Sequence, residues 1–227
     1  MNRSYPLLYA TTAAIWKEEL ERFLDKDLAR LAEGGHTLDS LESVWSERIA
    51  LGDDRDNLFL TGLPDRVTRD REGRLWISDY KTSGRLEKFT DPNRYLTGEY
   101  LQLPLYVLMA MGRQGSPTPM PEAEIIGLGP HFFPNYGFVG GDANRFDSDT
   151  FSEVAAGFSE TLSVLEHLVA AGRFPFRSAH HCRWCHFHLA CRRHQLSTES
   201  RVVEHPDHDV YFRMKDKTKK NSLLGAP

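Results

Sequence analysis

The feature that most constrains the fold is a pair of β-rich runs, residues 65–68 and 74–81, on either side of a polar, turn-like segment. Two such runs predict an antiparallel β-hairpin. With the turn centred on Glu72, Asp65 would face Asp79 at a backbone distance of roughly 5 Å. Lys81 follows Asp79 by two residues, so its side chain would project from the same face of the strand. The sequence therefore predicts two carboxylates and one ammonium group on one face of a hairpin.

Two ionised carboxylates held side by side repel each other unless a cation lies between them. Their oxygens are hard ligands, so the expected cation is Mg²⁺ or Mn²⁺ rather than a softer metal. Such an ion would polarise a phosphoryl oxygen and activate a bound water, while Lys81 would position that water or stabilise charge on phosphorus. This combination indicates phosphodiester hydrolysis. The alternative is that Asp65 pairs with Arg66, and Asp79 with Lys81, in ordinary surface salt bridges.

Three short motifs follow one another in this part of the chain. The first is G-x-x-D-R at Gly62–Arg66, and the second is D-Y-K-T at Asp79–Thr82, which ends a hydrophobic run. The third is Q-x-x-x-Y, whose Gln102 and Tyr106 share one face of a predicted helix. In this order the motifs resemble those of the RecB-like branch of the PD-(D/E)XK nuclease superfamily, which includes AddB-like subunits.

This resemblance implies an α/β protein with a restriction-endonuclease-like core, in which helices flank a central mixed β-sheet, and with a C-terminal cysteine-rich segment. It also implies the residues of the active site, some as metal ligands and some as catalytic or substrate-orienting groups. The implied ligands are Asp65, Asp79 and the backbone carbonyl of Tyr80, and the implied catalytic and orienting groups are Lys81, Gln102 and Tyr106.

Hydrophobic periodicity predicts the other elements. Apolar residues recur every three or four positions from Ile15 to Leu31, which predicts a long helix ended by Gly34 and Gly35. Residues 150–153 form a capping box that predicts the start of another helix. The remaining predicted elements are strands at 41–51, 57–61, 123–133 and 136–139 and a helix at 93–111.

The 227 residues, of which 40% are hydrophobic, suffice for one main domain. We expect a nuclease core at residues 1–178, a cysteine- and histidine-rich segment at 179–196 and a flexible tail at 197–227. No apolar run approaches the roughly 20 residues that cross a bilayer, and no signal peptide begins the chain, so a cytoplasmic protein is expected. The net charge of −4 argues mildly against a nucleic-acid binder but leaves room for a local basic groove.

All three cysteines lie in one C-x2-C-x5-C run, formed by Cys182, Cys185 and Cys191. Three thiolates at this spacing can hold most of a soft metal site or an iron-sulfur cluster. In the nucleases that the chain resembles, such a run binds a [4Fe-4S] cluster together with one upstream cysteine, which this sequence lacks.

Two alternatives remain for the cysteine run. A neighbouring histidine would complete a zinc site, or the cysteines bind no metal. The candidate histidines are His180, His181, His186, His188 and His194.

The resemblance also implies a metal-binding histidine before the hairpin, but no G-x-x-H segment precedes Asp65. His36 is expected in a solvent-exposed loop, and Glu47, an acidic substitute in principle, is expected on a strand facing water. The absent cysteine and histidine would both precede residue 1 in the family pattern. A truncated domain is therefore one interpretation of the sequence.

The leading hypothesis is a Mg²⁺- or Mn²⁺-dependent deoxyribonuclease, an exonuclease of DNA repair or recombination. Its expected partners are DNA and a helicase domain or subunit, since this chain has no phosphate-binding loop of the G-x-x-x-x-G-K-[ST] type. The second hypothesis is an inert nucleic-acid-binding or structural module of the same fold. The third is a small zinc-binding interaction domain at residues 180–194.

Overall fold

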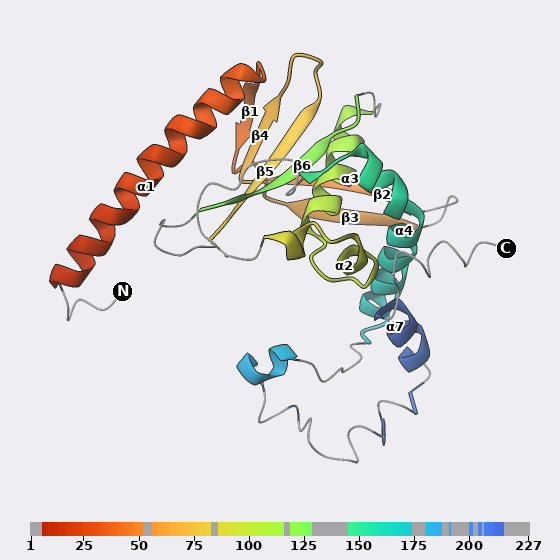
Figure 1. Cartoon of the computed structure of the whole chain (residues 1–227). Coiled ribbons are helices and arrows are strands. Elements are labelled where there is room, and N and C mark those ends of the chain that lie inside the picture. Colours follow the sequence, from red (N-terminus) through yellow and green to blue (C-terminus); the bar gives the residue numbers. More distant parts are fainter. Residues whose placement is uncertain are drawn as a thin grey trace.

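The computed structural model describes residues 6–51, 56–82, 86–115, 119–128, 145–173, 180–187, 191, 200–201, 204–205 and 207–215 (Figure 1). Its strands are β1 (Thr37–Leu41), β2 (Trp45–Leu51), β3 (Asp56–Gly62), β4 (Arg66–Arg69), β5 (Leu75–Lys81), β6 (Glu122–Gly127) and β7 (Arg145–Phe146). Its helices are α1 (Pro6–Glu33), η1 (Glu87–Phe89), α2 (Pro92–Leu96), α3 (Gln102–Gln114), α4 (Ser148–Ala170), η3 (His180–Trp184) and α7 (Asp207–Lys215).

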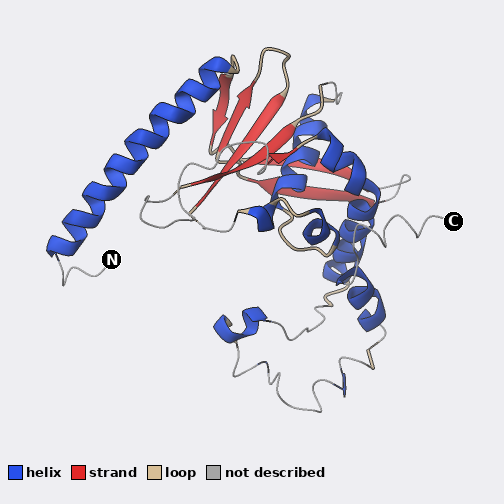
Figure 2. Cartoon of the chain, in the orientation of Figure 1, coloured by secondary structure: helices blue, strands red, loops and turns tan. Residues whose placement is uncertain are grey.

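A mixed five-stranded sheet with the order β1-β4-β5-β6-β7 forms the centre of the molecule. β5 pairs with β4 in antiparallel orientation and with β6 in parallel orientation, which requires the crossover through α3. Figure 2 shows the strands between α1 on one side and α3 and α4 on the other. The α/β fold with a helix-flanked mixed sheet is confirmed.

The two faces of this sheet differ in chemistry because charged and apolar residues alternate along its strands. On β5, Leu75 and Ile77 join the hydrophobic core with residues of α3, whereas Ser78 points to the face that α1 covers. On β6, Ala123 and Ile125 are core residues, and Glu124 pairs with a residue of α1. Asp79 and Lys81 continue the core-facing register of β5 beyond Ile77.

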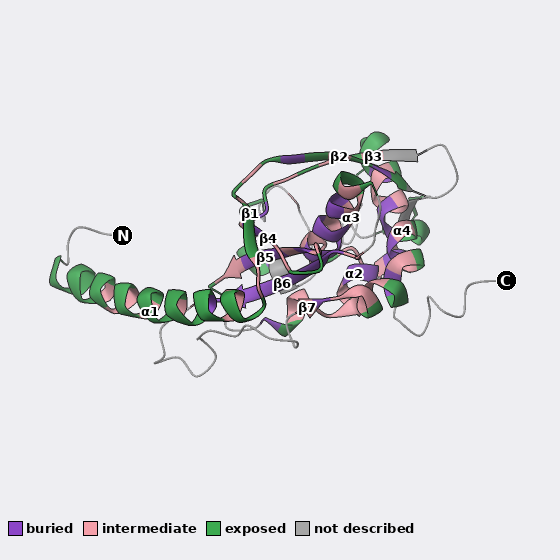
Figure 3. Cartoon of the chain, turned by 90° about the horizontal axis from the view of Figure 1, so that it is seen from above, coloured by how far each residue is buried: buried purple, intermediate pink, exposed green. Residues whose placement is uncertain are grey.

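The first helix is longer and more exposed than the sequence predicts. α1 ends at Glu33, before the two glycines as expected, but begins at Pro6. Its apolar residues Leu20, Leu24 and Leu28 are 41%, 50% and 61% exposed. In Figure 3 most of α1 is drawn as exposed, and the buried residues concentrate in β6, α3 and α4. Among the described residues, no helix is both long and apolar enough to span a membrane.

Three predicted element boundaries are wrong. The predicted helix at 93–111 is two helices, because Gly98 and Tyr100 adopt positive φ angles of 70° and 44° between α2 and α3. The predicted strand at 41–51 is split between β1 and β2, which belong to different sheets. α4 begins before the predicted capping box, because the Asp147 side chain accepts a hydrogen bond from the Thr150 N–H.

The predicted strand at 123–133 is shorter in the structure, and part of the predicted C-terminal tail is helical. β6 ends at Gly127, and the predicted strand at 136–139 lies outside the described residues. Within the segment predicted as a tail, residues 207–215 form α7 instead. Its Met214 is buried, and the Lys215 Nζ donates a hydrogen bond to the Thr97 carbonyl at 2.7 Å. This part of the C-terminal segment is therefore packed on the domain.

Candidate active site

The hairpin register predicted from the sequence is confirmed by the backbone pairing of β4 and β5. Arg66 pairs with Ser78, and Val67 pairs with Ile77. One step further along this register, Asp65 lies opposite Asp79. The Asp65 Oδ2 atom accepts a hydrogen bond of 2.8 Å from the Tyr80 N–H, which ties the loop before β4 to the end of β5. The two carboxylates are thus brought together at one end of the sheet.

Asp79 is a buried carboxylate, with 1% of its surface exposed. Its Oδ1 accepts a hydrogen bond from Gln102, and its Oδ2 forms an ion pair with the Lys81 ammonium group. Burial raises the pKa of Asp79 above its usual value; Lys81 opposes that rise, the Asp65 carboxylate adds to it, and the Gln102 amide opposes it. A buried carboxylate beside a second carboxylate gains stability from any further cation that can reach it.

Gln102 and Tyr106 connect the two segments that carry the carboxylates. The Gln102 Nε2 donates to Asp79 and also to the Tyr106 hydroxyl, at 3.2 Å. That hydroxyl donates in turn to the Leu63 carbonyl at 3.0 Å, in the loop that leads to Asp65. Both side chains lie on one helix, as the sequence predicts, but in the first turns of α3 rather than in the middle of a longer helix, and their hydrogen bonds fit a role in holding the carboxylates in place.

Gly62, the first residue of the G-x-x-D-R motif, leaves room for Tyr106. A Cβ atom at this position would lie 3.0 Å from Tyr106 Cε1 and 3.3 Å from Met109 Sδ. Both distances are tighter than ordinary side-chain contacts, so a larger residue would displace the ring. The glycine of the motif therefore allows α3 to approach the loop that carries Asp65.

Changing Tyr106 to phenylalanine is expected to lower the free energy of unfolding by about 1 kcal/mol, because the part-buried hydrogen bond from its hydroxyl to the Leu63 carbonyl would be lost. Urea denaturation of the wild type and the variant measures this difference. Tyr9→Phe is the matched control, since Tyr9 is 55% exposed on α1 and should show almost no change. Equal stability of Tyr106→Phe and the wild type would show that the hydrogen bond from Tyr106 to the Leu63 carbonyl does not stabilise the fold.

A buried network of charged side chains lies on the opposite face of the hairpin, and the sequence analysis missed it. The Arg66 guanidinium forms an ion pair with Asp27 of α1 and donates to the Ser78 hydroxyl at 3.3 Å. Ser78 donates to Glu124 at 2.7 Å, and Arg30 binds Glu124 with two hydrogen bonds of 2.9 Å. The signal available in the sequence was the charge at position 27 within the apolar run of the first helix.

This network rules out one of the salt-bridge alternatives. Arg66 is 6% exposed and pairs with Asp27 on the face away from Asp65. Asp79 does pair with Lys81, but it is buried, so the pair is not an ordinary surface salt bridge. The carboxylate of Asp65 is therefore not neutralised by the arginine that follows it.

The two residues considered as substitutes for the missing histidine lie elsewhere. The His36 Nδ1 is 3.1 Å from the Thr68 hydroxyl, and its ring packs edge-on against Trp76 on the α1 side of β5. It is therefore half-buried rather than in an exposed loop, and burial lowers its pKa. Glu47 pairs with Arg113 at 3.1 Å and is 19% exposed, so it does not face water as expected. Neither position supports a role beside Asp79.

The cysteine run is described only in part. Cys182 is buried, Cys185 and Cys191 are half-buried, and none of the three forms a disulfide with another described residue. The Cys185 N–H donates to the Cys182 carbonyl at 3.3 Å, so these two cysteines share one turn. His186 is exposed, while His188 and His194 lie outside the described residues, as do the side chains of His180 and His181. Within the described part of the chain, no three His, Cys, Asp or Glu side chains form a metal-binding group.

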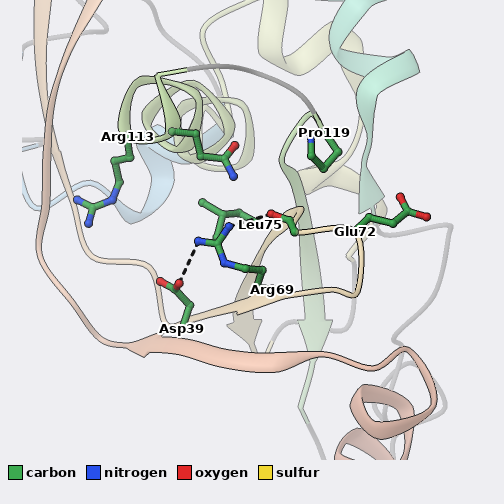
Figure 4. A pocket seen from close by; sticks show the side chains of 8 residues that line it. Asp39, Arg69, Glu72, Leu75, Arg113 and Pro119 are labelled. Carbon is green, nitrogen blue, oxygen red and sulfur yellow. Dashed lines mark hydrogen bonds and ion pairs between the residues drawn. The ribbon is translucent and has the colours of Figure 1, made fainter.

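A pocket lies at the turn of the β4–β5 hairpin, at the other end of β5 from Asp79 (Figure 4). The Arg69 guanidinium donates to Asp39 at 3.2 Å there, and Arg113 pairs with Glu47. Both cations are thus already held by carboxylates. The pocket also lacks the residues of the three sequence motifs, so the carboxylate end of the hairpin remains the candidate active site.

Comparison with known proteins identifies the family of the chain. The model of the PD-(D/E)XK nuclease superfamily matches residues 2–192. Comparisons with curated proteins and with solved structures give no match. The matched span covers most of the chain and includes the hairpin, α3 and the cysteine run, and the mixed sheet is consistent with the restriction-endonuclease-like fold of this superfamily. The chain therefore belongs to the PD-(D/E)XK nuclease superfamily.

Proposed function

We propose that the chain is a metal-dependent deoxyribonuclease whose active site is formed by Asp65, Asp79 and Lys81. Membership of the superfamily implies a nuclease, and the observation that carries the finer proposal is the meeting of two carboxylates across the hairpin. The lysine projects from the same face and pairs with the buried carboxylate. This arrangement combines hard oxygen ligands with a cation, which suits hydrolysis of a phosphodiester.

The residues present fit a divalent metal ion. Asp79 Oδ2 is buried and accepts no hydrogen bond from the described residues, and its ion-pair partner is the Lys81 ammonium. Asp65, Asp79 and the carbonyl of Tyr80 would hold Mg²⁺ or Mn²⁺, which prefer such oxygen ligands. When bound, the ion would supply Lewis-acid polarisation of a phosphoryl oxygen and a water of lowered pKa.

The chain's own side chains would perform the remaining tasks. The Lys81 side chain is 26% exposed, so its ammonium group can reach substrate and stabilise the negative charge that develops on the phosphoryl oxygens. Gln102 fixes the orientation of the Asp79 carboxylate through its hydrogen bond to Oδ1. Tyr106 holds Gln102 and the Leu63 carbonyl, so it acts as a positioning residue rather than on the substrate directly.

The affinity for Mn²⁺ is expected to fall as the pH decreases below the raised pKa of Asp79, because a proton and the metal compete for the same carboxylate. In that range the dissociation constant should rise about tenfold for each pH unit. Calorimetric titration with Mn²⁺ at several pH values, in two buffers of different ionisation enthalpy, measures both the affinity and the protons released. An affinity that stays constant from neutral pH down to the usual range of aspartate would show that Asp79 is not a ligand.

We further propose that the nuclease is an exonuclease of DNA repair or recombination that works with a helicase domain or subunit. The order of the three motifs supports this, since it resembles the RecB-like branch. We also propose that Cys182, Cys185 and Cys191 bind a [4Fe-4S] cluster, or zinc with a histidine as the fourth ligand. Metal analysis of the purified protein distinguishes iron, zinc and an empty cysteine run.

The proposed function is tested by digestion of end-labelled linear DNA and of closed circular DNA with Mg²⁺ or Mn²⁺. Degradation of the linear DNA alone would support an exonuclease, and cleavage of the circle would support an endonuclease instead. No cleavage of single- or double-stranded DNA by the folded chain would favour the inert module of the same fold. The same reactions in EDTA show whether cleavage requires the metal.

A further inference from the structure

A cluster of aromatic and cationic side chains lies next to the proposed catalytic lysine. We name it the Phe89 cluster and define it as Lys88, Phe89, Arg94 and Tyr100; Arg94 belongs to it because its guanidinium carbon lies 5.2 Å from the Tyr100 ring centroid. The Phe89 and Tyr100 rings meet edge-to-face, with their centroids 4.9 Å apart. The Lys88 Nζ lies 4.8 Å from the Phe89 centroid and 5.7 Å from the Tyr100 centroid. The Lys81 Nζ lies 5.9 Å from the Phe89 centroid, so the cluster is directly adjacent to the proposed active site.

The backbone around this cluster is held firmly. Tyr95, which is fully buried, donates a hydrogen bond of 2.6 Å from its hydroxyl to the Phe89 carbonyl. Tyr100 has a φ angle of 44°, a conformation that costs free energy for a residue other than glycine. Phe89 and Tyr100 are both half-buried residues, so each contributes some surface to solvent. The rings are thus presented at fixed positions at the surface.

The charges of the cluster are not equivalent. Arg94 pairs with Asp91 at 3.6 Å and with Glu99 at 3.1 Å, so carboxylates already neutralise much of its charge. Lys88 forms no ion pair with any residue in the described ranges, and the two rings hold its ammonium group by cation–π contacts. The cation that is available to an anionic ligand is therefore Lys88.

We propose that the Phe89 cluster binds a nucleotide next to the scissile phosphate of a single-stranded nucleic acid. This inference rests on the proposed nuclease function of Asp65, Asp79 and Lys81. Lys88 would contact a backbone phosphate, and Phe89 and Tyr100 would pack against an unpaired base. Bases in a duplex stack on each other, so accessible aromatic rings beside an active site favour a strand whose bases are free to stack on protein. The site thus selects single-stranded over double-stranded substrate.

The test compares cleavage of a single-stranded oligonucleotide and of its duplex by the wild type, Lys88→Gln, Phe89→Leu and Tyr100→Leu. Each aromatic substitution is expected to raise the KM for the single strand about tenfold, with kcat nearly unchanged, because stacking contributes to binding and not to the chemical step. Lys88→Gln should also reduce the dependence of log KM on log salt concentration by about 0.7, the value for one phosphate contact to a single strand. Lys17→Gln, an exposed lysine on α1, is the matched control.

The outcomes separate this inference from the proposed function. Cleavage by the wild type, with the wild-type KM in all three variants, would overturn the inference and leave the nuclease in place. An equal rise of KM for both substrates would overturn the assignment to single strands. If the wild type cleaves neither substrate, the proposed function fails, and fluorescence anisotropy of a labelled single strand with Ca²⁺ then decides the inference. Weaker binding in the variants supports the cluster, and unchanged binding overturns it.

Discussion

Asp79→Asn is expected to reduce the rate of metal-dependent DNA cleavage by about 10³-fold or more. The amide has nearly the same shape as the carboxylate but carries no charge, so it can neither hold Mg²⁺ firmly nor pair with Lys81. Cleavage of end-labelled DNA under single-turnover conditions measures the loss of the chemical step. Mn²⁺ titration of the same variant should show a loss of affinity in parallel, because one ligand is removed.

The matched control for this prediction is Asp39→Asn. Asp39 is an exposed aspartate on β1 that pairs with Arg69, and its change should leave the cleavage rate within about twofold of the wild type. A folded Asp79→Asn variant that cleaves at the wild-type rate would remove Asp79 from the active site. Lys81→Ala separates the two roles further, since it should lose cleavage by about 10²–10³-fold while it keeps the affinity for Mn²⁺.

The hairpin could be predicted from the sequence because its information is local. Two β-rich runs joined by a short turn fix the register, and the register alone brings Asp65 opposite Asp79. The end of α1 could also be predicted from local sequence, because two glycines follow it directly. By contrast, the break between α2 and α3 was missed, because apolar periodicity continues through it. Gly98 inside the helical pattern and Pro104, which falls in the first turn of α3, were the local signals of that break.

The face of the sheet behind the active site could not be predicted in the same way. Its contacts join Asp27, Arg66 and Glu124, which are far apart in the sequence. The alternation of Glu122 and Glu124 with apolar residues in β6 indicates a strand with one charged face. It does not indicate which arginines balance those charges. The partners follow only from the way in which α1 crosses the sheet, and this is a property of the tertiary fold.

The charged residues on this face help to position the proposed active site, because they alternate along the strands with the residues of that site. Arg66 follows Asp65, and Ser78 precedes Asp79, so the same two strand ends carry both groups. The network holds these strand ends on the face of the sheet that α1 covers, and Gln102 and Tyr106 hold them on the face that α3 covers. The backbone of the hairpin is thus held on both faces at the point where the two carboxylates meet.

Arg66→Ala is expected to lower the free energy of unfolding by about 3–5 kcal/mol at neutral pH, which is the usual cost of removing one partner from a buried ion pair. Asp27 and Glu124 are each 2% exposed, and Asp27 would lose its ion pair with Arg66. Urea denaturation measures the difference. Arg48→Ala, an exposed arginine on β2, is the matched control and should stay within about 0.5 kcal/mol of the wild type.

The loss of unfolding free energy in Arg66→Ala, here called the deficit, should become smaller as the pH decreases. In the wild type, burial acts to raise the pKa of Asp27, but hydrogen bonds from Arg66 and Arg30 outweigh it and hold the pKa below its usual value. The resulting stabilisation is present above the unfolded-state pKa and is lost as the pH falls through the folded-state pKa. In Arg66→Ala the Asp27 carboxylate keeps only its contacts with Arg30, so less of this stabilisation remains to be lost, and the deficit should narrow as the pH falls below the unfolded-state pKa of 3.8. An exposed ion pair contributes less than about 1 kcal/mol to the free energy of unfolding. If Arg66→Ala loses no more than this, and the loss does not vary with pH, then α1 does not hold the proposed catalytic hairpin through Arg66.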